Sequence, residues 1–303
     1  MKRVIITGAT GAIGTALVRK LIDKKIEVLV FLRVDSQRNQ NIPCHPLVHI
    51  KFCSLEQLAD VENDTGKVYD IFYHLAWRGA SGPERNDMYI QNQNVKYALD
   101  AVRAAKKFGC QTFIGAGSQA EYGNWEVPLQ CDTPVFPNMG YGYAKLCAGQ
   151  MTREYAAQLE LKHIWVRILS VYGPNDSAGS MIMYTIDKLR QGMEPKLTKG
   201  EQMWDYLYSD DAAKALYLLG KMGIDRKIYV LGSGTTRPLK DYIQKIRDIA
   251  APGRNLSFGT IPYGKNQTMY LCADTSELKR DTGWHPETDF NDGIRTIIKS
   301  LQM

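Results

Sequence analysis

The sequence predicts an α/β protein in which a doubly wound parallel sheet is followed by a smaller C-terminal lobe. Three observations support this fold class. Short apolar runs alternate with segments of helical periodicity through the first half of the chain. The runs are apolar throughout, which is typical of strands buried on both faces of a sheet. A glycine-rich turn directly follows the first run and opens an amphipathic segment.

The individual elements follow from these patterns. Ile13, Leu17 and Leu21 recur at helical spacing, and Gly109 is a suitable stop for a later helix. The apolar runs predict strands over 4–7, 26–32, 48–52, 68–75, 112–115 and 163–169. The segments between them predict helices over 13–22, 94–108 and 141–159.

The pattern changes after Tyr172-Gly173-Pro174, where loops lengthen and aromatic residues increase. The segment 204–219 nevertheless predicts a strand and a helix that return to the first domain, followed by a strand over 228–231. We therefore expect one domain over 1–172 plus 205–235 and a second lobe over 173–204 plus 236–303.

Composition excludes several classes of protein. The 303 residues are 44% hydrophobic and 23% charged, which is typical of a globular chain. The formal net charge of +6 is scattered rather than gathered in a basic run, so nucleic acid is not an expected partner. No apolar run approaches the roughly 20 residues that span a bilayer, and the start lacks the apolar stretch of a signal peptide. We expect a cytoplasmic protein without membrane contact.

Cysteines and histidines give no sign of a metal centre. The six cysteines contain no CxxC pair, which argues against a clustered zinc site and a disulfide framework. The histidines show no spacing typical of metal ligands. His74 ends an apolar strand, and we expect a structural role for it. No metal is predicted.

The glycine-rich turn predicts a dinucleotide site. Gly8 permits a tight turn, Gly11 lets a pyrophosphate approach the backbone, and Gly14 lets the helix pack closely. Free backbone N–H groups at the helix start then face the anion. The predicted contacts of this turn are Gly8, Ala9, Thr10, Gly11, Ala12, Ile13 and Gly14.

The end of the second strand favours NADP(H) over NAD(H). An acidic residue there would bind the adenosine ribose hydroxyls, but the strand ends in Arg33, and Arg38 is nearby. A guanidinium can bind a 2′-phosphate through forked, charge-assisted hydrogen bonds. Asp35 is the competing candidate, because it could serve the ribose instead.

Three residues predict hydride-transfer chemistry. Tyr141 and Lys145 lie four residues apart, so both can face one pocket from a helix. A nearby ammonium favours the phenolate and would lower the pKa of Tyr141, as acid–base catalysis requires. Ser118 follows the fifth strand at the ligand edge, and the small residues before it leave room for a nicotinamide. Asn94, predicted to open a helix, is either an N-cap or a site residue.

These motifs resemble the extended short-chain dehydrogenase/reductase family, which comprises nucleotide-sugar epimerases, dehydratases and ketoreductases. The resemblance is carried in order by TGATGAIG, HLAW, GSQAEYG, YGYAK, RILSVYGP, WDYLYSDD, GSG and ADTSELKRDTGW. It implies a Rossmann domain and a substrate-binding lobe. It also implies that Tyr141 is the general acid/base, that Lys145 tunes it and holds the nicotinamide ribose, and that Ser118 orients the substrate oxygen. The cofactor candidates added on this basis are Ser54, Leu55, Leu75, Ala76, Trp77, Asn94, Tyr141 and Lys145.

Departures from the family pattern narrow the expected reaction. Gln119-Ala120 replace the Asp-Glu pair of the dehydratases, which argues against water elimination. Trp204 replaces an arginine that often meets the diphosphate, and Ser170 replaces an asparagine. Gln119, Ser170 and Trp204 are the substrate-binding candidates, and Arg237 and Lys265 are candidates for the missing positive charge.

The sequence thus predicts an NADP-dependent oxidoreductase that reduces the 4-keto group of a CDP- or dTDP-linked keto-deoxyhexose. One alternative is an NAD-dependent nucleotide-sugar 4-epimerase. A second, from another class, is a non-catalytic NADP-sensing protein. The family resemblance also implies a homodimer formed through a four-helix interface.

Overall fold

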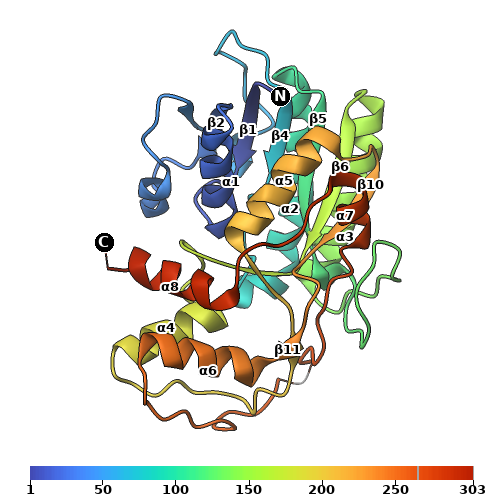
Figure 1. Ribbon diagram of the computed structural model, residues 1–303. Coiled ribbons are helices and arrows are strands. Elements are labelled where there is room, and N and C mark those ends of the chain that lie inside the picture. The colour runs from blue at the N-terminus through green and yellow to red at the C-terminus, as the bar shows by residue number, and fades with distance from the viewer. Residues whose placement is uncertain (265, 303) are drawn as a thin grey trace.

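A computed structural model describes residues 1–264 and 266–302 (Figure 1). Its centre is a sheet of seven strands, all paired in parallel, in the order β10-β6-β5-β4-β1-β2-β3. The predicted doubly wound sheet is therefore confirmed. The strands are β1 (Arg3–Thr7), β2 (Glu27–Leu32), β3 (Val48–Phe52), β4 (Ile71–His74), β5 (Thr112–Ser118), β6 (Lys162–Ile168) and β10 (Lys227–Leu231).

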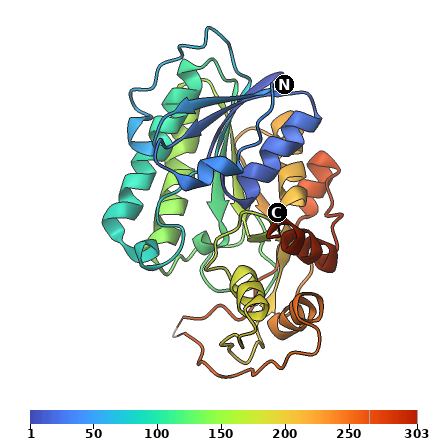
Figure 2. The same cartoon turned by 90° about the vertical axis from the view of Figure 1, so that its left-hand side faces the viewer.

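Helices cover both faces of this sheet (Figures 1 and 2). α1 (Ala12–Asp23) packs beside α5 (Ser209–Met222), and α2 (Met88–Lys107) packs beside α3 (Gly140–Gln158). Each pair buries a separate apolar cluster against its face of the sheet, with Leu17 and Leu216 in one cluster and Ala101 and Ala156 in the other. The strands are consequently buried on both sides, which explains why their sequences are apolar throughout.

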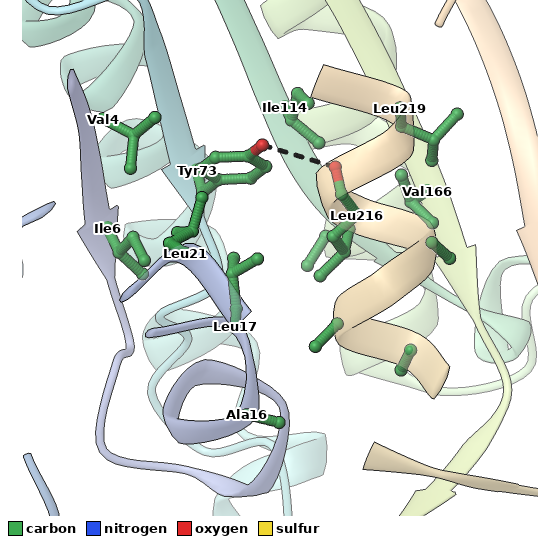
Figure 3. Close-up of a cluster of buried hydrophobic side chains, with 14 of the residues drawn as sticks. Val4, Ile6, Ala16, Leu17, Leu21, Tyr73, Ile114, Val166, Leu216 and Leu219 are labelled. Carbon is green, nitrogen blue, oxygen red and sulfur yellow. Dashed lines mark hydrogen bonds between the residues drawn. The ribbon is translucent and has the colours of Figure 1, made fainter. Parts of the chain in front are cut away.

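The α1–α5 side holds the larger of these two clusters (Figure 3). Leu17 and Leu21 of α1 meet Leu216 and Leu219 of α5 within it, and all four side chains are fully buried. Tyr73 crosses from β4, and its hydroxyl donates a hydrogen bond to the Leu216 carbonyl oxygen at 3.3 Å. This bond satisfies the one polar group of the tyrosine within an apolar layer.

A smaller lobe lies below the carboxyl ends of the strands (Figure 1). An aromatic cluster that includes Tyr172, Tyr206, Tyr242 and Phe290 forms its core. Its helices are α4 (Met181–Arg190), α6 (Leu239–Ala250) and α8 (Phe290–Ser300). Two short strand pairs lie beside these helices. β8 (Met203–Trp204) pairs with β11 (Arg237–Pro238), and β7 (Ser170–Tyr172) pairs with β9 (Tyr206–Tyr208), both of which also contact α5 of the first domain.

The helix α7 (Ser276–Thr282) packs against β10 and α5 of the first domain. Its Leu278 and the following Trp284 belong to the cluster under the main sheet. The lobe boundaries 173–204 plus 236–303 remain a prediction. α7 falls within the second of these ranges, although it packs against elements of the first domain.

Several predicted elements have different bounds in the structure. The strand predicted over 68–75 contains only β4, because Val68 is exposed and the Tyr69 N–H bonds to the Phe108 carbonyl. The helix predicted to open at Asn94 begins at Met88. Its N-cap is Asp87, which accepts hydrogen bonds from two backbone N–H groups of the first turn. The N-cap role of Asn94 was therefore wrong.

The chain order creates a crevice between β1 and β4. β1 pairs with β2 on one side and with β4 on the other, so the connections diverge there. In open α/β sheets ligands bind at such a switch point, beyond the carboxyl ends of the strands. Within residues 1–264 and 266–302, no helix is both long and apolar enough to span a membrane. The same residues contain no group of three metal-ligating side chains.

Leu216→Ala tests the interface between α1 and α5. Removing this fully buried side chain leaves a cavity beside Leu17 and Tyr73, so we expect unfolding to become easier by about 2–5 kcal/mol. Urea denaturation measures the change. Leu301→Ala is the matched control, because Leu301 is 42% exposed and should change stability by about 0.5 kcal/mol or less. Equal effects would contradict the assigned core.

Candidate active site

A cleft of about 780 Å³ opens at the carboxyl ends of β1, β2, β3 and β4. Most of the predicted cofactor residues line it. Ile13, Tyr141 and Lys145 instead line a second cleft, while Ala12, Gly14 and Asn94 line neither. The predicted residues in the first cleft are Gly8, Ala9, Thr10, Gly11, Arg33, Ser54, Leu55, Leu75, Ala76 and Trp77.

The glycine turn has the shape that a dinucleotide requires. Gly8 has a φ of +74°, and a Cβ there would lie 2.5 Å from the Ala76 backbone nitrogen. A Cβ on Gly14 would lie 2.2 Å from the Gly8 carbonyl oxygen, so Gly14 makes room for the turn itself. A Cβ on Gly11, the N-cap of α1, would meet only the Gly8 oxygen, at 4.0 Å. The backbone is thus open to a phosphate at the helix start, and the residues fit a dinucleotide.

The cleft wall beyond β2 carries two arginines. Arg33 and Arg38 both line it, whereas the exposed Asp35 does not. The Asn39 side chain donates a 2.8 Å hydrogen bond to the Arg33 carbonyl, which fixes the backbone there. The Arg38 guanidinium donates to the Asn175 carbonyl. Positive charge therefore lies where the sequence predicts the 2′-phosphate.

The second cleft, of about 510 Å³, brings Ser118, Tyr141 and Lys145 together. The Lys145 ammonium donates a 2.7 Å hydrogen bond to the Ala116 carbonyl and lies 3.7 Å from the Trp77 ring centroid. Its distance to the Tyr141 ring centroid is 5.7 Å. The three substrate candidates Gln119, Ser170 and Trp204 line the same cleft. Tyr141 and Lys145, four residues apart on one helix, therefore face the same cleft, as their spacing predicts.

Burial dominates the ionisation of the tyrosine and the lysine. It raises the pKa of Tyr141, opposed by a hydrogen bond with Ser118 and by the positive charge of Arg85. It lowers the pKa of Lys145 to about 7, opposed by the charge of Glu121. Desolvation penalises the charged form of each group. The prediction that Lys145 lowers the pKa of Tyr141 was therefore wrong. The cation that opposes the rise of this pKa is Arg85.

Glu121 anchors Ser118, a role that the sequence did not predict. Its carboxylate accepts hydrogen bonds from the Ser118 backbone at 2.8 Å, the Trp165 indole at 3.0 Å and the Arg167 guanidinium at 2.7 Å. Glu121 and Arg167 are almost completely buried. Since a buried carboxylate needs such partners, the network fixes the end of β5.

The small residues of β5 have a second purpose that the sequence did not predict. A Cβ on Gly115 or Gly117 would lie within 2.4 Å of the Trp165 ring, and one on Gly149 of α3 would lie 2.7 Å from it. Those glycines therefore make room for the Trp165 indole, while the expectation that this stretch leaves room for a nicotinamide stays a prediction. Ala116 and Gly117 also line the second cleft.

Asn94 acts on the segment after β4 rather than on either cleft. Its amide accepts from the Arg78 N–H at 3.0 Å and donates to the Arg78 carbonyl at 2.8 Å. One turn earlier, Gln91 accepts from the Trp77 indole at 2.8 Å and donates to the Gly79 carbonyl. These two buried amides hold the loop that separates the clefts. Only the tertiary fold shows this role.

The two family departures contact each other. The Trp204 indole donates a 2.9 Å hydrogen bond to the Ser170 hydroxyl at the edge of the second cleft. Arg237, a candidate for the missing charge, is exposed and pairs with Trp204 between β11 and β8. Lys265, the other candidate, lies outside the described residues. The sequence could mark these departures but not their contact.

The doubly wound sheet, the glycine turn at its crevice and the Ser118–Tyr141–Lys145 cleft define a short-chain dehydrogenase/reductase of the extended type. The chain belongs to the NAD dependent epimerase/dehydratase family, whose sequence profile matches residues 4–232. The predicted family and fold are thereby confirmed.

Relatives with known names align over nearly the whole chain. CDP-abequose synthase of Salmonella typhimurium is 27% identical, and the alignment covers 98% of each protein. dTDP-4-dehydro-6-deoxyglucose reductase of Escherichia coli is 24% identical and covers 99% of this chain and 97% of that one. UDP-N-acetylglucosamine 4-epimerase of Methanobrevibacter ruminantium, solved with UDP-N-acetylmuramic acid, has a TM-score of 0.88, 24% identity and coverage of 100% and 99%. The structural match shows a shared fold.

Glu121→Gln tests the anchor under Ser118. The substitution leaves the Arg167 charge buried without its partner, so we expect a loss of about 3–5 kcal/mol in unfolding free energy. Denaturant unfolding measures the loss. Asp292→Asn is the control, because its pair with Arg295 is at the surface and should contribute about 1 kcal/mol or less. A loss of control size for Glu121→Gln would contradict the anchor.

Proposed function

We propose that this protein is an NADPH-dependent reductase of the 4-keto group of a nucleotide-linked keto-deoxyhexose. The convergence of Ser118, Tyr141 and Lys145 in a cleft beside the dinucleotide cleft carries the proposal. Gln119 and Ala120, which directly follow Ser118, offer no acid or base for eliminating water. Simple carbonyl reduction is the chemistry that this residue set supports best.

When bound at the glycine turn, the reduced dinucleotide would supply the hydride that the carbonyl carbon accepts. The Tyr141 hydroxyl gives its proton to the carbonyl oxygen, which becomes the alcohol. The Ser118 hydroxyl donates a hydrogen bond to the same oxygen and fixes its position against the phenol. Lys145 would bind the ribose of the cofactor, and Trp77 would close the cleft beside it. The burial of Ser118 and Lys145 favours the exclusion of water.

NADP is the proposed dinucleotide because Arg33 and Arg38 line the cleft beyond β2 and Asp35 does not. Ser36, between them, adds a hydroxyl to the same wall. Forked guanidinium donors match the oxygens of a 2′-phosphate, whereas a ribose hydroxyl favours a carboxylate acceptor.

A CDP- or dTDP-linked sugar is the proposed substrate class. The similarity to CDP-abequose synthase and to dTDP-4-dehydro-6-deoxyglucose reductase supports it. The second lobe would bind this substrate, since Met181 and Ile182 of α4 line the second cleft. A homodimer would use the outer face of α3, where Tyr143 and Met151 are exposed, together with the neighbouring α2.

A test of turnover separates this proposal from its alternatives. We expect the purified protein to oxidise NADPH when given CDP- or dTDP-4-keto-deoxyhexoses, and Tyr141→Phe to lower kcat by about 100-fold or more because the proton donor is lost. Absorbance of NADPH follows the reaction, and fluorescence titration shows whether cofactor affinity is kept. Phe keeps the ring that contacts Arg85 and Trp77.

Other outcomes identify the alternatives. Copurified NAD, with interconversion of UDP-sugars and no consumption of added cofactor, would instead support a nucleotide-sugar 4-epimerase. NADPH binding without turnover of any sugar would support the non-catalytic sensor, although a sensor has no need for Ser118, Tyr141 and Lys145 in one cleft.

Arg33→Ala tests the cofactor preference. We expect NADP(H) affinity to fall by roughly 10-fold or more, since a charge-assisted bond to the 2′-phosphate is lost, while NAD(H) affinity stays the same. Isothermal titration with both dinucleotides measures this. Asp35→Asn is the paired variant and should change neither affinity. The predicted preference would be contradicted if Asp35→Asn lowered the affinity for NAD(H) while Arg33→Ala left the affinity for NADP(H) unchanged.

A further inference from the structure

Arg85 contacts the catalytic tyrosine, although the proposed mechanism assigns it no role. It lies in the short 3-10 helix Pro83–Asn86, after β4. Its guanidinium carbon is 4.7 Å from the Tyr141 ring centroid, and its side chain lines the same cleft as Ser118. In the described residues its Nε is buried and has no hydrogen-bond acceptor. The side chain is therefore held by its contact with the ring rather than by an ion pair at Nε.

The neighbours of Arg85 fix its position relative to Tyr141. The Asn86 side chain accepts a 2.8 Å hydrogen bond from the Gly140 N–H, at the start of the helix that carries Tyr141. The Gln91 amide donates a 2.9 Å hydrogen bond to the Glu84 carbonyl. The residues on both sides of Arg85 are thus tied, one to α3 and one to α2. The short helix that carries Arg85 is therefore anchored to both helices, beside the Tyr141 ring.

We propose that Arg85 is a positioning residue for Tyr141, and that its guanidinium stabilises the phenolate that remains when Tyr141 gives up its proton. A cation above an aromatic face is attracted by the ring, and the attraction grows when the ring carries negative charge. This inference rests on the proposed acid–base role of Tyr141 and adds a second residue to it.

Arg85 is better suited to this task than Lys145. The Lys145 ammonium is bound to the Ala116 carbonyl and lies closer to Trp77 than to Tyr141. Burial lowers the pKa of Lys145 to about 7, so its positive charge is held less firmly near neutral pH than that of a guanidinium. A guanidinium keeps its charge throughout the physiological range.

The other groups that act on Tyr141 come from β5 and from the 3-10 helix Gln119–Glu121 that follows it. Ser118 favours the phenolate by hydrogen bonding, and the Glu121 carboxylate opposes it. The positive charge of Arg85, on the 3-10 helix Pro83–Asn86, opposes the effect of that carboxylate. Removing Arg85 should therefore favour the protonated form of Tyr141 over the phenolate.

Titration of Tyr141 in Arg85 variants tests the inference. Tyrosine labelled at Cζ is followed by NMR against pH, and the signal missing from Tyr141→Phe identifies Tyr141. We expect Arg85→Gln to lower the ionised fraction of Tyr141 at a given alkaline pH by about threefold or more, and Arg85→Lys to restore part of it. Arg190→Gln is the matched control, because it removes one exposed positive charge from the end of α4.

The outcomes are distinct. Superimposable Tyr141 titrations for wild type and Arg85→Gln, including two that stay protonated throughout, would overturn the role of Arg85. A shift in Arg190→Gln of the same size would also overturn it, because a general charge effect would then suffice. The titration requires no substrate, so a failure of the ketosugars to react would contradict the proposed function and leave this test intact. Where they do react, the alkaline limb of the pH profile of kcat, along which Tyr141 loses the proton that it must donate, should move to higher pH in Arg85→Gln.

Discussion

The contact between Trp165 and Glu121 is the constraint on which the proposed catalytic cleft depends. The indole lies against three glycines, two on β5 and one on α3, and its nitrogen donates to the Glu121 carboxylate. Any side chain at Gly149 would push α3 away from β5. The close approach sets the separation between Ser118, on the strand, and the tyrosine and lysine on the helix. One buried aromatic ring thus determines the spacing of the proposed catalytic residues.

The charges near the cleft are arranged in two ways. Glu121 and Arg167 form an ion pair in the interior, and the Glu121 carboxylate also accepts a hydrogen bond from the Ser118 N–H. Removing one partner of such a pair would leave the other charge buried and uncompensated, which is costly. Lys145 and Arg85, in contrast, have no carboxylate partner within the described residues. Their charges remain available to the cofactor and to Tyr141.

Much of the site could be predicted because its residues belong to local patterns. The glycine turn follows from a strand, a tight turn and a helix start within a few residues, and Tyr141 and Lys145 follow from helical spacing. Asn94 shows the limit of such patterns. Its amide resembles an N-cap in sequence, yet α2 begins at Met88, and Asn94 bonds the loop after β4 from within the helix. No sequence pattern indicated a role for Arg85, because Tyr141, the residue that it contacts, lies more than fifty residues further along the chain.

The sequence by itself determined the fold class, the glycine turn and the Tyr141–Lys145 spacing, since each depends on apolar periodicity or on the conformation of neighbouring residues. Only the tertiary structure decided that the β5 glycines accommodate Trp165, that Ser170 bonds Trp204, and that Arg85 covers Tyr141. These contacts join residues far apart in the chain. Their geometry depends on how whole elements pack, which no local periodicity encodes.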